Sequence, residues 1–181
     1  MNTILLLSEE FIKENSVIYN DVSPKIFTSA IFESQNIQYK YLLPNDLYKD
    51  IFTQFNDYKT YVDEGGTDPI EDQIDARILD LVNESKYMLL YATLYNASYS
   101  LYTRITNKGI VSENSNYSED IDINIIEDMR KNWKQKYQSY SDLLNEYLSE
   151  NNSAYPEYSS LDSCESVSKI FSNPLYLGDE I

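Results

Sequence analysis

The stretch that decides the fold is residues 70–109, which read IEDQIDARILDLVNESKYMLLYATLYNASYSLYTRITNKG. Apolar or aromatic residues recur there every three or four positions, apart from one double step, and no Gly or Pro interrupts them before Gly109. The recurring positions are Ile70, Ile74, Ile78, Leu81, Met88, Ala92, Tyr95, Tyr99 and Tyr102. Pro69 suits a first helical position, and Glu71, Asp72 and Asp75 favour the positive end of the helix dipole. We therefore expect one long helix, or two nearly collinear ones, beginning near residue 70.

The second half of this helix carries no charged residue from Tyr87 to Thr103, and tyrosines follow each other there at four-residue steps. Such a surface predicts that other elements wrap this half on most sides, as in the central helix of a bundle. The run is long enough for a short membrane span, but its five tyrosines, Asn96 and several hydroxyls would be costly in hydrocarbon. We expect no contact with a membrane.

Composition limits the classes of function. The 181 residues are 42% hydrophobic, so we expect one core, with a domain over residues 1–158 and a separate segment over 159–181. Histidine is absent, glycine numbers only four and Cys164 is alone, which removes the usual metal ligand, the usual acid–base residue and an internal disulfide. We expect no enzyme, and hence no catalytic residue, cofactor or metal; the acidic break at 63–69 lacks the ligand spacing of a calcium loop. The start of the chain lacks the pattern of a secretory signal, which favours an intracellular compartment.

Acidic residues dominate the charge, which is −16. Residues 63–75 hold six acids and no base, residues 113–128 hold six more and no base, and from Gln138 onward eight acids accompany Lys169 alone. A surface of this sign repels nucleic-acid phosphates, so we expect no sequence-specific binding of DNA or RNA. A solvated acidic surface that maintains solubility is the plain alternative explanation of the same charge.

Capping residues and periodicity predict four further helices. They span about 8–15, 23–38, 44–61 and 118–150, with a connection over 39–43; Ser8, Ser23 and Ser118 are the expected caps. The last helix has a stripe of heptad-like spacing at Ile126, Met129, Trp133, Tyr137, Tyr140, Leu144 and Tyr147, which predicts antiparallel packing on the central helix with Trp133 in the core. Opposite the stripe lie Arg130, Lys131 and Lys134, with Lys136 nearby, which we interpret as partners for local carboxylates or for an acidic neighbouring subunit.

One segment favours extended structure. Arg104, Ile105 and Thr106 precede Asn107, Lys108 and Gly109, and Ile110 and Val111 follow, which predicts a short hairpin or strand-turn with Gly109 at positive φ. We therefore predict an all-α helical bundle with two long antiparallel helices, one short β hairpin or strand-turn and an extended C-terminal arm. A turn projecting from the longest helix could add a strand to a neighbour's edge, which makes Arg104, Thr106, Asn107, Lys108, Gly109 and Ile110 candidate interface residues.

The segment Ser159–Ile181 mixes acidic and small polar residues with larger apolar ones, six of them between Val167 and Leu177, without a sustained period. A tail with such anchors is typical of an arm that becomes ordered on another surface. We expect Phe171, Leu175, Tyr176 and Leu177 to dock on a neighbouring subunit, and a tail folded back on its own subunit is the open alternative.

Several segments together resemble a known family. They are the helix after Pro44 with Leu47 and Tyr48, the run Leu90-Tyr91-Ala92-Thr93-Leu94-Tyr95-Asn96-Ala97, the turn Arg104–Val111, and a closing helix that ends in Tyr147-Leu148 and Tyr155-Pro156-Glu157-Tyr158. Over roughly residues 3–158 the chain resembles the head-to-tail connector proteins, also called adaptor or ring proteins, of tailed phages. The resemblance is to those of the crAss-like group and of related prophages in Bacteroides-type hosts.

The resemblance implies a structural virion protein. Its subunits would be made in the host cytoplasm and would assemble as a homo-oligomeric ring, usually twelvefold, below the portal. The ring would contact the portal protein and further tail or ring proteins, and DNA would pass through its channel without specific binding. The resemblance brings no catalytic residues, and it adds Tyr155 and Tyr158 to the candidate interface.

Two other classes of function remain open at this point. A small acidic intracellular helical module that binds another protein would share the helices and the charge, but it would stay monomeric at high concentration. A carboxylate hydrolase would need two acids of unequal pKa in a cleft, whereas Glu113, Glu119, Asp120 and Asp122 lie in an expected loop and helix start.

Overall fold

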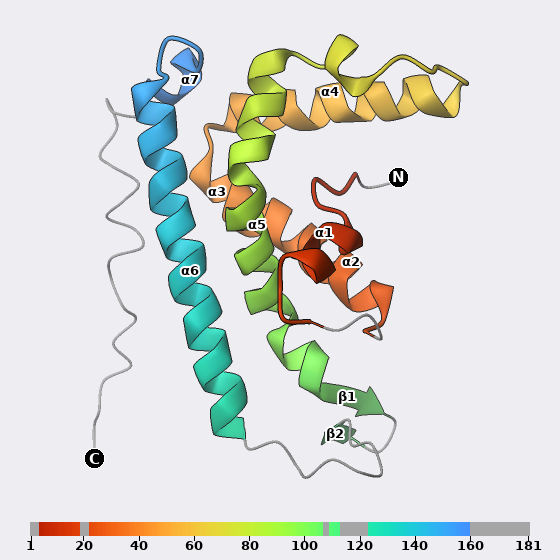
Figure 1. Ribbon diagram of the computed structural model, residues 1–181, viewed down its shortest axis with the longest axis vertical. Helices are drawn as coiled ribbons and strands as arrows, with labels where there is room; N and C mark the ends of the chain where they lie inside the picture. The colour runs from red at the N-terminus through yellow and green to blue at the C-terminus, as the bar shows by residue number, and fades with distance from the viewer. Residues whose placement is uncertain (1–3, 19–21, 107–108, 113–122, 160–181) are drawn as a thin grey trace.

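Two long helices, α5 (Ala76–Tyr102) and α6 (Ile123–Glu150), form the centre of the molecule and lie side by side in Figure 1. They run antiparallel, because Tyr87 stacks on Tyr140 while Tyr99 bonds to Glu127. These positions come from a computed structural model, which describes residues 4–18, 22–106, 109–112 and 123–159. For 102–106, 109–112, 123 and 159 it describes the backbone only. The helical class predicted from the sequence is confirmed.

The start of α5 differs from the prediction. A short 3-10 helix, η2 (Ile70–Asp72), comes first, and α5 begins only at Ala76. The reason is Asp75, whose carboxylate accepts from the Arg77 amide at 3.0 Å as a helix cap while its own amide donates to the Gln54 side chain at 2.9 Å. The expectation of a helix from residue 70 was wrong in this respect, since Asp75 caps the helix instead of lying within its first turn.

The N-terminal helices pack against the face of α5 that α6 leaves free. They are α1 (Glu9–Glu14), α2 (Pro24–Ser34), a π-helical turn η1 (Gln35–Tyr39) and α3 (Lys40–Leu42). The predicted cap Ser8 is confirmed, since its hydroxyl accepts from the Phe11 amide at 3.1 Å. Ser23 precedes α2 as predicted but makes no side-chain capping bond.

The expected connection over 39–43 is helical instead as far as Leu42. A π-helical turn keeps the chain helical through this segment, and its first and last residues are both buried. Gln35 is fully buried, where it accepts from the Leu6 amide at 2.6 Å and donates to the Ile4 carbonyl at 3.0 Å. Tyr39 is also fully buried, with its hydroxyl 3.0 Å from Ser85 Oγ. The turn therefore fastens the N-terminal segment to the core.

Pro44 precedes α4 (Asn45–Asp63), as the sequence predicts. In Figure 1 α4 crosses the end of α5 at the top of the view, where the short helix α7 (Pro156–Ser159) also lies beside the end of α6. The apolar core runs between these elements and includes Phe27, Ile31, Leu47, Ile51, Ile78, Leu81, Met88, Leu89, Leu90, Trp133, Leu144 and Leu148. Trp133 is 5% exposed, which confirms its predicted place in the core.

At the opposite end, α5 continues directly into β1 (Thr103–Thr106), which pairs antiparallel with β2 (Gly109–Ser112). Thr103 lies opposite Ser112 and Thr106 opposite Gly109. Several predicted features fall outside the described residues, namely the cap Ser118, the turn residues Asn107 and Lys108, and the proposed anchors Phe171, Leu175, Tyr176 and Leu177.

Candidate functional site

The seam between α5 and α6 is built from the tyrosines that α5 presents at four-residue steps. Tyr140 of α6 inserts between Tyr87 and Tyr91, with both pairs of ring centroids 5.5 Å apart. Lys136 places its ammonium 4.8 Å from the Tyr91 ring centroid. A cation over an aromatic face is attracted by the ring quadrupole, so this contact holds the lysine over the ring.

Further along the seam, Arg130 lies over two rings, 4.3 Å from the Tyr95 centroid and 4.7 Å from the Tyr99 centroid. The Tyr99 hydroxyl donates to Glu127, and this bond raises the pKa of Tyr99 above its ordinary value. The expectation that Arg130 would pair with a local carboxylate was therefore incomplete, because its planar guanidinium stacks on tyrosines. Lys131 fits the expectation better, with its ammonium 3.4 Å from Asp128.

Beside this seam is an open cavity of about 650 Å³, which we call the α1–α6 groove. One wall is the segment after α1, residues 14–17, and the other is α6 from Ile125 to Lys136; Tyr91 and Leu94 of α5 also line it. Val17 and Ile125 are 75% and 54% exposed, so large apolar side chains face solvent on both walls. Polar and charged side chains share the lining, namely Glu14, Asn15, Ser16, Asp128, Asn132 and Lys136. A concave surface that combines apolar walls with a few polar groups is suited to receiving a partly apolar segment.

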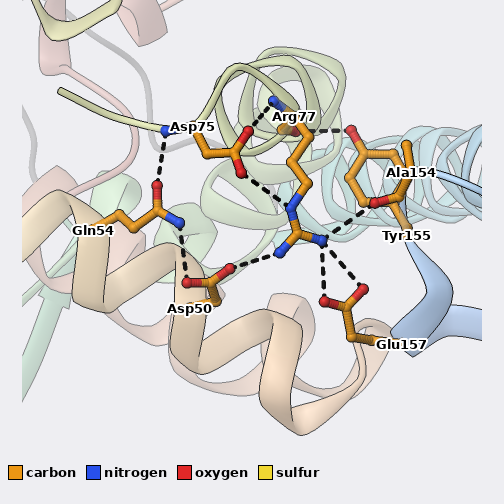
Figure 2. A network of polar contacts seen from close by, with 7 residues as sticks. All are labelled: Asp50, Gln54, Asp75, Arg77, Ala154, Tyr155 and Glu157. Carbon is orange, nitrogen blue, oxygen red and sulfur yellow. Dashed lines mark hydrogen bonds and ion pairs between the residues drawn. The ribbon is translucent and has the colours of Figure 1, made fainter. Parts of the chain in front are cut away.

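A cluster around Arg77 holds the opposite end of the molecule together (Figure 2). The guanidinium donates to Asp50 of α4 at 2.9 Å, to Glu157 of α7 at 3.0 Å and to the Ala154 carbonyl at 3.2 Å, and its Nε lies 3.4 Å from Asp75. Burial acts to lower the pKa of Arg77, but the bonded Glu157 carboxylate, with Asp50 and Asp75, raises it overall. One planar side chain thus joins α4, α5 and α7.

Tyr155 also belongs to this cluster. Its hydroxyl donates to the Arg77 carbonyl at 2.8 Å and lies 3.2 Å from the Tyr147 hydroxyl. Tyr155 is only 1% exposed, so its side chain packs inside its own subunit and offers little surface to a neighbour. Tyr158 is half-buried and donates to Asn145 of α6 at 3.0 Å, which leaves part of its ring accessible.

The remaining predicted interface residues are distributed as follows. Arg104, Thr106, Gly109 and Ile110 lie on the β1–β2 ladder, which the structure describes as backbone, and Asn107 and Lys108 fall between the described strands. The ladder and the Arg77 cluster are at opposite ends of α5, so the structure does not bring the candidates into one site.

Sequence reasoning missed Arg77. A signal for it existed, because Arg77 is the only base between Lys59 and Lys86, in a stretch crowded with acids. A lone base among acids at a helix start indicates a shared counter-ion.

Within residues 4–18, 22–106, 109–112 and 123–159, no three His, Cys, Asp or Glu side chains gather in a way that could hold a metal ion. Over the same residues, every helix is too short or too polar to cross a membrane. The polar clusters around Arg77 and Ser85 fasten helices to one another.

A protein-family model matches residues 39–168, which is most of the chain and covers α4, α5, both strands, α6 and α7. The chain therefore belongs to that family, described as a family of unknown function, DUF6712. No curated protein and no solved structure matches it.

Proposed function

We propose that this member of a family of unknown function is a structural virion protein, a subunit of the head-to-tail connector ring that extends the DNA channel below the portal. The proposal starts from the likeness to phage connector proteins over roughly residues 3–158. The fold is compatible with it, because a subunit built around two long packed helices can span the wall of a ring.

The observation that carries the proposal is the two-stranded ladder at the end of α5. Within the described residues β1 pairs with β2 alone, so each strand has an outer edge without a partner strand there. Such an edge is a template for a strand of another chain. The ladder also continues directly from α5, away from α4 and α7 (Figure 1), where a neighbouring subunit can reach it.

The charge supports a channel through which DNA slides. Each Lys or Arg that contacts a phosphate adds a salt-dependent attraction between protein and DNA. A chain of net charge −16 offers few such contacts, so DNA would slide past it without being bound. Arg130 and Lys136, two members of the basic cluster on α6, are already engaged with tyrosine rings of the same subunit. The basic cluster therefore has an intramolecular role that needs no nucleic acid.

The C-terminal segment belongs to the same proposal. Phe171, Leu175, Tyr176 and Leu177 would dock on a neighbouring subunit, where each buried large side chain contributes roughly 1.5–3 kcal/mol. Ordering the segment costs a comparable amount, so several anchors must engage together.

Deletion of Thr106–Ile110 tests the role of the ladder. We expect the shortened chain to retain its helical circular dichroism and melting transition while it fails to form rings and fails to enter virions. The matched control deletes five residues, 113–117, from the neighbouring Ser/Asn-rich segment, and this chain should still assemble. Normal incorporation of the Thr106–Ile110 deletion into particles would show that the ladder is no interface.

A further inference from the structure

The proposed function assigns no role to the α1–α6 groove. The two walls of this groove expose apolar side chains to solvent. Val17 on the α1 side and Ile125 on the α6 side are both more than half exposed, while Trp133 contributes to the lining from the core. Large exposed apolar side chains on both sides of one cavity indicate a surface that something covers.

The charge beside the groove narrows the chemistry of the partner. From Met129 to Ser141, α6 carries Arg130, Lys131, Lys134 and Lys136 and no acid, which is four of the fourteen bases of a strongly acidic chain. Lys136 itself lines the groove, together with the acids Glu14 and Asp128, so the excess of bases lies along α6 beside the groove and not in its lining. A segment that combines apolar anchors with acidic residues would match both the cavity and the basic stretch next to it.

Residues 160–181 of this chain have that composition. They contain Val167, Ile170, Phe171, Leu175, Tyr176 and Leu177 together with Asp162, Glu165, Asp179 and Glu180, against the single base Lys169. The apolar side chains of this segment match the exposed apolar walls of the groove, and its acids match the basic stretch of α6 beside the groove.

The starting point of the segment is held firmly. Glu157 bonds to Arg77 and Tyr158 bonds to Asn145, which fastens α7 beside the last turns of α6. Along α6, Asn145 lies 12 residues from Trp133, which is about 18 Å of helix. The 12 residues from Ser159 to Phe171 can extend over about 40 Å. The extended segment is therefore about twice as long as the distance to the groove of its own subunit, which leaves length to cross to an adjacent copy.

We propose that the α1–α6 groove of each subunit receives the apolar part of the C-terminal segment, around residues 167–177, from a neighbouring copy of the chain. This inference rests on the proposed ring, since the ring places a second copy within reach. Phe171 and its neighbouring anchors cover Val17, Ile125 and the accessible edge of Trp133. The acids that flank these anchors on both sides then lie near the bases of α6.

Site-directed cross-linking on the full chain tests this directly. Cys164 is the only cysteine, so Cys164→Ser gives a cysteine-free background. In that background one chain carries Val17→Cys in the groove and a second chain carries Ser172→Cys next to Phe171. The two chains are mixed, assembled and treated with a flexible bis-maleimide. A cross-link in the mixture joins two copies, because neither chain alone holds both thiols.

The matched control replaces Val17→Cys by Val62→Cys, another exposed apolar position, near the end of α4. We expect cross-linked dimers with Val17→Cys and none with Val62→Cys. Adding Ile125→Asp to the groove chain should lower the cross-linking yield at limiting concentration by about tenfold, because a charge replaces an apolar contact.

Negative-stain images of the same samples separate the two proposals. Rings without a Val17–Ser172 cross-link would overturn the groove proposal and leave the ring standing. A chain carrying both cysteines that cross-links only within itself would also overturn it, since the segment would then lie on its own subunit. Absence of rings would count against the proposed function itself.

Discussion

Replacing Arg77 by Met should destabilise the subunit more than any other single change of a charged residue that the structure describes. Methionine retains the apolar stem and removes the guanidinium. Three carboxylates, Asp50, Asp75 and Glu157, would then face one another without their shared cation. Their mutual repulsion adds to the loss of the hydrogen bonds.

The size of the expected destabilisation depends on how exposed the paired side chains are. The Arg77 side chain is 27% exposed, and those of Asp50 and Glu157 are 34% and 28% exposed, so these contacts are only partly screened by solvent. A hydrogen bond to a charged group contributes about 1.5–3 kcal/mol, and the more exposed Asp75 contributes little. We expect Arg77→Met to lower the free energy of unfolding by about 2–4 kcal/mol. For a chain of this size the melting temperature should fall by roughly 5–12 °C.

Urea unfolding followed by circular dichroism measures this change. Arg77→Lys, which retains the charge but loses the planar fork, should cost about half as much. Lys59→Met is the matched control, because its pair with Asp63 is on the surface, and its cost should stay below about 1 kcal/mol. Combining Arg77→Met with Glu157→Gln should show a coupling energy of about 1–2 kcal/mol. If Arg77→Met cost no more than Lys59→Met, the cluster would not fasten α4 and α7 to α5.

Three further predictions concern other parts of the subunit. Trp133→Ala should cost about 3–5 kcal/mol in urea unfolding, and a loss below about 1 kcal/mol would show that the ring is not part of the core. Burial raises the pKa of Tyr39 above its ordinary 10.0, so the stability contributed by its protonated form is complete below pH 10.0 and is lost as pH rises toward the folded-state pKa. The free energy of unfolding should accordingly fall above pH 10.0, and less steeply in Tyr39→Phe; equal slopes would contradict the assignment. Limited proteolysis of the isolated subunit should cut between about Tyr158 and Ile170. The remaining core should melt as before, but it should assemble poorly. Protection of this segment in a monomeric sample would instead mean that the segment packs on its own bundle.

The elements that could be predicted are those whose signals are local. Ser8 caps α1 through its own side chain, and Pro44 precedes α4 where the fixed φ of proline favours a helix start. The stripe on α6 identified Trp133 and the packing partner because helical periodicity determines which side chains share a face.

The features that escaped prediction depend on residues distant in sequence. Asp75 caps α5 partly because the side chain of Gln54, from another helix, accepts a hydrogen bond from the Asp75 amide. The π-helical turn at 35–39 exists where Gln35 bonds to the chain around Ile4 and Leu6. Neither contact leaves a periodic trace in the sequence.

The candidate site was harder to predict than the fold for the same reason. Tyr155 was a candidate interface residue, and it is buried in its own subunit because Arg77 and Tyr147 supply partners for its hydroxyl. The bases on α6 suggested surface ion pairs, but the tyrosines of α5 offered rings on which Arg130 could stack. Charge pattern alone does not distinguish a carboxylate partner from an aromatic one.

Imaging the purified full chain by negative-stain electron microscopy, with its mass in solution measured by light scattering at high concentration, tests the central claim most directly. A connector subunit predicts closed rings of uniform diameter, with a mass that is a fixed multiple of the 21.1 kDa subunit. A small acidic binding module predicts single subunits at every concentration. Particles of 21.1 kDa alone, with no rings in the images, would contradict the proposed function.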